Sequence, residues 1–193
     1  RTVEFVMATN LSPLTDERLR FCRDHQVQIS TSLDGPEWLH NKNRPKRGND
    51  SHRRTVEGIE RVRAALGPNG LSALMTTSIG SLKHPKGIID EYVRLGFRSI
   101  FLRWISPYGF ALRSTKTSSY ETEQFLDFYK RGLDYVLELN KQGVPFQEEY
   151  ASIILRKMLT PWGRGYADLQ SPTSLGLSVL VYNYDGDVYA SDE

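Results

Sequence analysis

The sequence ISTSLDGPEWLHNKNRPKRGNDSH, residues 29–52, joins the end of a strand to a polar, basic loop. The β-rich run predicts a strand, and the turn residues Asp34, Gly35 and Pro36 end it. A basic segment that contains Arg44 follows, and Ser51 is a suitable first residue for a helix. Because parallel sheets bind ligands where their strands end, this stretch is either a simple turn or one wall of a site.

Strands and helices alternate on both sides of this stretch. We expect strands over residues 3–9, 27–33, 71–77 and 98–105, and helices over residues 16–25, 51–66 and 84–96, with a loop over 34–50. No tight hairpin signal lies between the strands, so the order predicts a parallel sheet with right-handed crossovers. The fold class is α/β, as a (β/α) barrel or a doubly wound sheet. No glycine-rich phosphate motif follows a strand, which disfavours the nucleotide-binding versions.

The pattern changes in the second half of the chain. A long amphipathic helix is expected over residues 120–142 and a second helix over roughly 147–159. A linker rich in Gly, Pro and Ser follows at 160–176. Two β-rich runs around Asp185 and Gly186 then predict a hairpin with a type I′ turn.

Composition narrows the class of protein. The chain has 193 residues with a net charge of +2, which gives no reason to expect a nucleic-acid or membrane partner. Cys22 is the only cysteine, so an internal disulfide and a metal site built from cysteines alone are both excluded within this chain. No apolar run is long enough for a membrane span, and we expect a cytoplasmic protein.

The residues at the expected strand ends form a polar set of hydroxyls, an amide, a carboxylate and an arginine. They lie at residues 9–10, 32–35, 76–78 and 103–108. The set lacks the His, Lys or paired carboxylates typical of acid/base catalysis, so a cofactor would have to supply any difficult chemistry. Arg103 lies within an expected strand and would need an anionic partner if it points inward.

Several of these motifs together resemble one family, the radical S-adenosylmethionine enzymes with a SPASM-type C-terminal region. They are TNL at 9–11, SLDGP at 32–36, HNKNR at 40–44, then Gly48 and Ser51. The family includes peptide and protein maturases such as the anaerobic sulfatase maturases. Residues 99–111 and 180–193 are similar to the maturase of the His-Xaa-Ser repeat peptide system.

The resemblance implies how the chain is organised. Residues 1–118 would form the middle and later strands of a partial (β/α)6 barrel, 119–160 a helical connector, and 161–193 a linker and the hairpin that begins the SPASM-like region. The cysteines that hold the family's 4Fe-4S cluster would lie upstream of Arg1. The chain is then an internal fragment, and we expect the fragment alone to be inactive.

The same resemblance implies cofactor-binding residues. Ser32 and Arg44 match the positions that hold the methionyl part of S-adenosylmethionine, as a hydroxyl and a guanidinium can. Thr9 and Asn10 belong to the strand-end motif beside the cofactor, and Asp34 and Gly35 belong to the motif that contains Ser32. A separate match places Ser106 where the family contacts adenosine.

The hairpin resembles the start of the SPASM region, in which a Gly precedes a Cys-Asp pair. Gly186 matches the Gly, but Ser191 stands where the cluster-binding Cys would be, which argues against a first auxiliary cluster. Asp192 matches a carboxylate that takes a proton from the substrate in sulfatase maturases.

The implied function is modification of a ribosomally made peptide or protein through a 5′-deoxyadenosyl radical. Its partners would be the peptide or protein substrate and a reductant such as flavodoxin or ferredoxin. Two alternatives remain: a (β/α)-barrel lyase or hydrolase, and a degenerate peptide-binding module without catalysis. A Cys-x3-Cys-x2-Cys loop in the preceding sequence would distinguish them.

Overall fold

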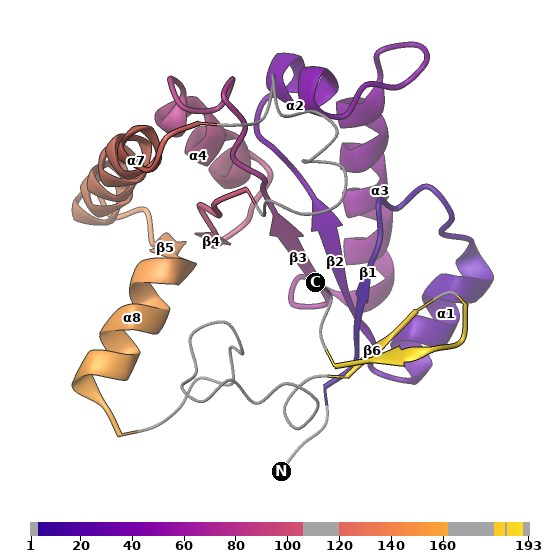
Figure 1. Ribbon diagram of the computed structural model, residues 1–193. Helices are drawn as coiled ribbons and strands as arrows, with labels where there is room; N and C mark the ends of the chain where they lie inside the picture. Colours follow the sequence, from indigo (N-terminus) through magenta and orange to yellow (C-terminus); the bar gives the residue numbers. More distant parts are fainter. Residues whose placement is uncertain (1–3, 106–119, 162–179, 184, 191–193) are drawn as a thin grey trace. The chain divides into compact units, whose positions relative to one another are not determined.

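The structure is a computed structural model that describes residues 4–105, 120–161, 180–183 and 185–190. It divides into two compact units, residues 1–149 and 150–193 (Figure 1). The first unit is a mixture of parallel strands and helices, which confirms the predicted α/β class. The domain boundaries near residues 118 and 160 stay predictions. None of the described helices is both long and apolar enough to span a membrane.

Three parallel strands form the main sheet of the first unit. They are β1 (Val6–Ala8), β2 (Gln28–Ser32) and β3 (Leu71–Leu74), which lie side by side in chain order (Figure 1). In the register, Ile29 pairs with Met7 on one side and with Leu71 on the other. The carboxyl ends of the strands therefore lie at one edge of the sheet, as the sequence predicted.

A second parallel pair corrects one prediction. Strand β4 (Ser99–Ile100) pairs with β5 (Gln147–Glu148). The sequence predicts a helix from about residue 147, but the Gln147 N–H donates to the Arg98 carbonyl at 2.9 Å. Helix α8 (Glu149–Leu159) begins only after this strand. The Glu148 carboxylate accepts hydrogen bonds from the Leu102 N–H and the Tyr129 hydroxyl, which holds β5 against its neighbours.

The expected helices form where capping and periodicity predict them. They are α1 (Asp16–Asp24), α3 (Ser51–Leu66), α4 (Pro85–Arg94) and α7 (Thr122–Lys141). Thr15 caps α1 by accepting from the Arg18 N–H at 3.3 Å, and Pro85 opens α4, as proline does at a first helical position. Helix α7 begins with a capping box formed by Glu121 and Gln124.

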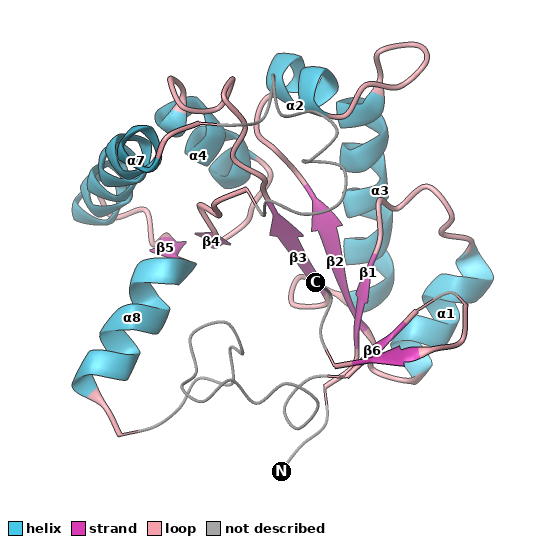
Figure 2. Ribbon diagram, viewed as in Figure 1, coloured by secondary structure: helices cyan, strands magenta, loops and turns pink. Residues whose placement is uncertain are grey.

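A short helix replaces part of the expected loop over residues 34–50. Helix α2 (Glu37–Asn43) follows Pro36 directly (Figure 2). Its buried residues are Leu39, His40 and Asn41, so most of its buried face is polar. An apolar period could not reveal this helix, because Leu39 is the one apolar residue among its three buried residues and hydrogen bonds hold the other two.

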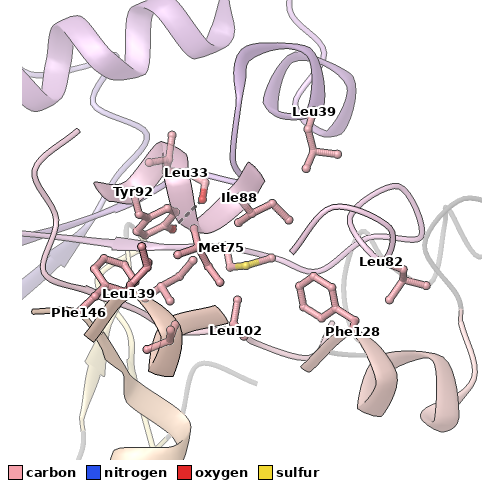
Figure 3. Close-up of a cluster of buried hydrophobic side chains, with 13 residues drawn as sticks. Leu33, Leu39, Met75, Leu82, Ile88, Tyr92, Leu102, Phe128, Leu139 and Phe146 are labelled. Carbon is pink, nitrogen blue, oxygen red and sulfur yellow. Dashed lines mark hydrogen bonds between the residues drawn. The ribbon is translucent and has the colours of Figure 1, made fainter. Parts of the chain in front are cut away.

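Two apolar clusters fill the first unit. One cluster joins Leu11, Leu19, Ile29, Ile59 and Val62 between the sheet, α1 and α3. The other, drawn in Figure 3, packs α4 and α7 against the strand ends and contains Leu33, Met75, Ile88, Tyr92, Leu102 and Phe128. A Cβ at Gly132 would lie 2.6 Å from Leu102 Cδ1, so α7 approaches that segment as closely as glycine allows.

The described part of the second unit contains a small hairpin. Strand β6 (Val181–Tyr182) pairs antiparallel with β7 (Val188–Tyr189). The predicted type I′ turn is wrong, because Val181 pairs with Tyr189 and Tyr182 with Val188, a register that a two-residue turn at Asp185 and Gly186 cannot give. The Asn183 N–H donates to the Asp187 carbonyl at 3.1 Å, so a longer loop with glycine in the left-handed region closes the hairpin.

Candidate cofactor-binding edge

Ser32 is the last residue of β2, at the carboxyl edge of the sheet. It is half-buried and pairs in register with Leu74 of β3. Successive side chains of a strand lie on opposite faces of the sheet, and the next residue, Leu33, is fully buried in the cluster with α4. The Ser32 hydroxyl has no hydrogen-bond partner among the described residues and can therefore contact a ligand at this edge.

Asp34 and Arg44 form an ion pair just beyond this strand end. Arg44 Nε donates to Asp34 Oδ2 at 2.8 Å, and Nη2 donates to Asp34 Oδ1 at 3.1 Å. The Asp34 side chain is 2% exposed, whereas that of Arg44 is 37% exposed. The carboxylate is thus inside the protein, and the guanidinium reaches from it toward solvent. Two of the five N–H donors of Arg44 are used, and the Nη1–Nη2 edge is left for another acceptor.

Buried hydrogen bonds fix the backbone that carries this pair. The Asp34 N–H donates to His40 Nδ1 at 3.2 Å, and His40 Nε2 lies 3.4 Å from the Thr55 hydroxyl of α3. The Tyr92 hydroxyl of α4 donates to the Leu33 carbonyl at 2.7 Å (Figure 3). Residues 33–34 are therefore held by α2 and α4, and α3 supports His40, so the Asp34 partner of Arg44 is fixed in place.

The His40 imidazole is uncharged at neutral pH. Burial lowers its pKa to about 4, and the positive charges of Arg44 and His52 act in the same direction, against the carboxylates of Asp34 and Glu91. Since Nδ1 accepts from Asp34, the single proton of the neutral ring lies on Nε2. His40 thus acts here as a structural acceptor and is not available as a base to a ligand.

Protonation of His40 at acidic pH should destabilise the folded protein. Its pKa is about 4 in the folded protein and about 6.5 when unfolded. The folded state therefore favours the neutral ring, and stability is lost as the pH falls from about 6.5 to about 4. We expect a loss of about 3 kcal/mol over this range. Urea unfolding gives the free energy of unfolding at each pH in this range. Its slope against pH should be markedly smaller for His40→Gln than for wild type and unchanged for the exposed control His25→Gln. Equal slopes for wild type and both variants would contradict the role of His40.

A second buried network joins α2, α3 and α4. Asn41 Oδ1 accepts from the Ser51 hydroxyl and the His52 N–H, both at 2.8 Å, so α2 caps the start of α3. His52 Nε2 lies 2.7 Å from Glu91 Oε1, and Arg94 donates to both Glu91 oxygens. Burial raises the pKa of Glu91, but the hydrogen bonds from Arg94 and His52 and their charges outweigh it and lower the pKa to about 2.

Thr9 and Asn10 serve the turn after β1. The Thr9 hydroxyl accepts from the Leu11 N–H at 3.2 Å, and Asn10 Oδ1 accepts from the Ser12 N–H at 3.1 Å. These local bonds support Leu11, which has a positive φ of 64°. Both side chains thus stabilise this turn, while their contact with a cofactor stays a prediction.

Gly35 serves close packing. It has a φ of +122°, and a Cβ there would lie 2.9 Å from Ile88 Cγ1 on α4. Glycine is therefore required for the chain to turn against α4 immediately after Asp34.

The end of β3 lies against this site. The Thr76 N–H donates to Asp34 Oδ1 at 3.2 Å, and the Thr77 N–H donates to the Arg103 carbonyl at 3.3 Å. Successive amides of one segment therefore hold the Asp34–Arg44 pair on one side and the segment after β4 on the other. The hydroxyl of Thr77 is buried without a partner among the described residues.

The sequence predicted Ser32, Asp34 and Arg44 as cofactor-binding residues, and those roles stay predictions. It did not predict that His40, Thr76 and Tyr92 hold this segment, although Thr76 lies in the polar strand-end set. His40 lies in the HNKNR motif, which was the signal available for it. Ser106 and Asp192 lie outside the described residues, and their roles stay predictions. Within the part of the chain that the structure describes, no group of His, Cys, Asp and Glu could hold a metal ion.

The described side chains at this edge are better suited to binding a polar group than to transferring protons. A guanidinium edge suits a carboxylate or phosphate, and a serine hydroxyl suits a polar group beside it. The nearby imidazole is buried and neutral, and the nearby Tyr92 hydroxyl has a pKa raised well above its usual range by burial and by the Asp34 charge. Any reaction here would rely on the ligand for its chemistry.

The fold is similar to that of solved structures of anSMEcpe, an anaerobic sulfatase-maturing enzyme. The structure with bound AdoMet and Kp18Cys peptide matches with a TM-score of 0.68 and 16% identity over 98% of this chain. The structure with AdoMet and Cp18Cys peptide gives 0.67 and 16% over 83%, and the one with AdoMet gives 0.63 and 16% over 81%. This chain spans 51%, 45% and 42% of those chains, or about half their length.

At such identity the similarity concerns the fold alone. The sequence matches no protein-family model. No curated protein matches it either.

Proposed function

We propose that this chain is part of a radical S-adenosylmethionine enzyme that modifies a peptide or protein, and that Ser32 and Arg44 hold the methionyl end of S-adenosylmethionine. The observation that carries the proposal is the Arg44 guanidinium, anchored by buried Asp34 with one edge left for an acceptor. The narrower interpretation, a maturase of a His-Xaa-Ser repeat peptide, rests on the sequences of residues 99–111 and 180–193.

The Arg44 geometry supports binding of the methionyl carboxylate. Nε and Nη2 are bonded to Asp34, so a ligand carboxylate would meet the Nη1–Nη2 edge, where two parallel N–H groups remain. The Asp34 charge also offsets that of Arg44, which reduces repulsion of the positively charged sulfonium and ammonium of S-adenosylmethionine. The hydroxyl of Ser32 can accept from that ammonium group.

The chemistry itself would come from the bound group. When bound at a reduced 4Fe-4S cluster, S-adenosylmethionine supplies a 5′-deoxyadenosyl radical that abstracts hydrogen from the substrate. The described residues do not fit the cluster, because cysteine thiolates are its usual ligands and the only cysteine, Cys22, is buried on the core-facing side of α1. The cluster ligands would have to be supplied from outside this chain, and we assign these residues only to cofactor binding.

The wider parts of the proposal follow from fold and sequence together. We infer that the consecutive parallel strands belong to a partial (β/α) barrel, because β1, β2 and β3 are neighbours in chain order. A peptide or protein substrate is proposed because two of the similar structures contain bound peptides. A cytoplasmic location and a reductant such as flavodoxin or ferredoxin complete the proposal.

Replacing Arg44 tests the cofactor role directly. In the anaerobically purified whole protein, Arg44→Gln should weaken S-adenosylmethionine binding about 10- to 100-fold, since hydrogen bonds to charged groups contribute about 1.5–3 kcal/mol. Binding of decarboxylated S-adenosylmethionine should change little, because that analogue lacks the group that Arg44 would bind. Isothermal titration calorimetry measures both affinities.

The analogue makes the result specific. A folding defect would weaken the binding of both ligands equally, whereas loss of a carboxylate contact would weaken only the binding of S-adenosylmethionine. Arg47→Gln is the matched control, an exposed arginine in the same loop, and should bind both ligands like wild type. Equal affinity of Arg44→Gln and wild type for S-adenosylmethionine would refute the role, and absence of binding by wild type would favour the lyase, hydrolase or peptide-binding alternatives.

A further inference from the structure

Arg103 is a half-buried arginine that the proposed cofactor site does not use. Three of the described arginines are half-buried: Arg44, Arg63 and Arg103. Arg44 is paired with Asp34, and Arg63 donates to the Leu95 carbonyl and lies 4.5 Å from the centre of the Phe97 ring. The guanidinium of Arg103 has no hydrogen bond or ion pair with any described residue. A partly dehydrated guanidinium is stabilised by an acceptor, and none of the described residues supplies one, so this position is suited to an external anion.

The backbone places Arg103 beside the cofactor edge. Thr76 and Thr77 bind, through successive N–H groups, the Asp34 carboxylate and the Arg103 carbonyl. Ile100 and Leu102 are buried in the cluster with α4 and α7, whereas Phe101 and Arg103 do not belong to it. Arg103 is half-buried, and its side chain is not part of that cluster. Ser32 is likewise outside that cluster, whereas its neighbour Leu33 belongs to it.

The chemistry of the neighbouring ligand decides which anion Arg103 takes. S-adenosylmethionine has a single carboxylate, for which Arg44 is already placed, and its sulfonium and ammonium groups would be repelled by a second arginine. A guanidinium fork matches a carboxylate in geometry and charge. We propose that Arg103 binds a side-chain carboxylate of the peptide substrate, so that the enzyme prefers peptides with an acidic residue near the modified position. This inference rests on the proposed function.

Selection from a display library of random heptapeptides tests the preference in the whole protein. Wild type should enrich Asp- and Glu-containing peptides. In Arg103→Gln this enrichment should be about tenfold smaller, and a tenfold change in affinity corresponds to about 1.4 kcal/mol. Arg98→Gln is the matched control, an exposed arginine at the opposite end of β4, and should select like wild type. Arg103→Lys keeps the charge without the fork and should give an intermediate enrichment.

S-adenosylmethionine binding, measured on the same preparations, separates the two proposals. Unchanged cofactor affinity together with loss of acidic selection in Arg103→Gln supports the inference. Identical selection by Arg103→Gln and wild type, or no acidic enrichment by wild type, overturns it while leaving the cofactor site intact. Weaker binding of S-adenosylmethionine but not of its decarboxylated analogue by Arg103→Gln also overturns it, because the carboxylate would then belong to the cofactor. Failure of wild type to bind S-adenosylmethionine refutes the proposed function itself.

Discussion

Asp34→Ala should lower the free energy of unfolding by about 2–4 kcal/mol, among the largest effects of any substitution near the strand ends. The carboxylate accepts two hydrogen bonds from Arg44 and one from the Thr76 N–H, and it is almost completely buried. Its removal leaves the Thr76 donor without a partner and the Arg44 charge partly buried and unpaired. The loss stays below the full cost of breaking a buried pair, because Arg44 can turn toward water.

The same substitution should reduce S-adenosylmethionine affinity by at least about tenfold, since Arg44 would no longer be held in one orientation. Urea unfolding and titration calorimetry measure the two effects. Asp16→Ala is the control, because Asp16 pairs with Arg61 at the surface, and such exposed pairs contribute about 0–1 kcal/mol. Equal stability of Asp34→Ala and Asp16→Ala would contradict the anchoring role.

Asp34→Asn separates charge from shape. An amide of the same size can still accept from Thr76 but cannot pair as an ion with Arg44. We expect a stability between those of wild type and Asp34→Ala, with cofactor affinity close to that of Asp34→Ala. This pattern would show that the charge of Asp34, rather than its volume, positions Arg44.

The sequence predicted those elements whose signals are local. Helix α3 begins at Ser51 and ends at Leu66 as expected, because its apolar stripe and the glycine that ends it, Gly67, are both local features of the sequence. Pro85 likewise predicted the start of α4. The order of these elements was enough to predict a parallel α/β fold.

Elements stabilised by distant partners could not be predicted in this way. Strand β5 consists of Gln147 and Glu148 only and exists because β4, far away in sequence, lies beside it. Helix α2 lacks an apolar stripe, since its polar inner face bonds to residues that follow it in the chain. In both cases the deciding interaction is absent from the local pattern.

The candidate site shows the same division. Motif spacing predicted Ser32 and Arg44 as binding residues, but it did not reveal that Arg44 is already bonded to Asp34 along one edge. That pairing depends on helix α2, which brings Arg44 back toward the end of β2. Predicting a bidentate contact with a ligand therefore required knowing which donors the protein itself occupies.

The base of the site also depends on helix α4. Glu91 of α4 binds His52 of α3, and the backbone N–H of His52 binds Asn41 of α2. Helix α2 also carries His40, which holds the Asp34 backbone. The position of Arg44 is thus linked through α2 and α3 to a buried carboxylate on α4.

Glu91→Gln should lower the free energy of unfolding at neutral pH by about 3 kcal/mol. The pKa of Glu91 is lowered from 4.5 to about 2 in the folded protein, which favours folding with the ionised carboxylate by about 1.4 kcal/mol per unit. A group of this kind stabilises the folded state above its unfolded pKa, and the contribution disappears as the pH falls from about 4.5 to about 2. Gln keeps the shape but cannot carry the charge that His52 and Arg94 surround.

The pH dependence provides the critical comparison. Stabilities of wild type and Glu91→Gln, measured by urea unfolding, should differ most above pH 4.5 and should converge near pH 2, where the wild-type carboxyl becomes protonated. Glu57→Gln removes an exposed carboxylate that pairs with Arg53, and its curve should follow wild type throughout. A constant difference between Glu91→Gln and wild type down to pH 2 would mean that Glu91 acts through packing, and the charge network would then not explain how α4 supports the cofactor edge.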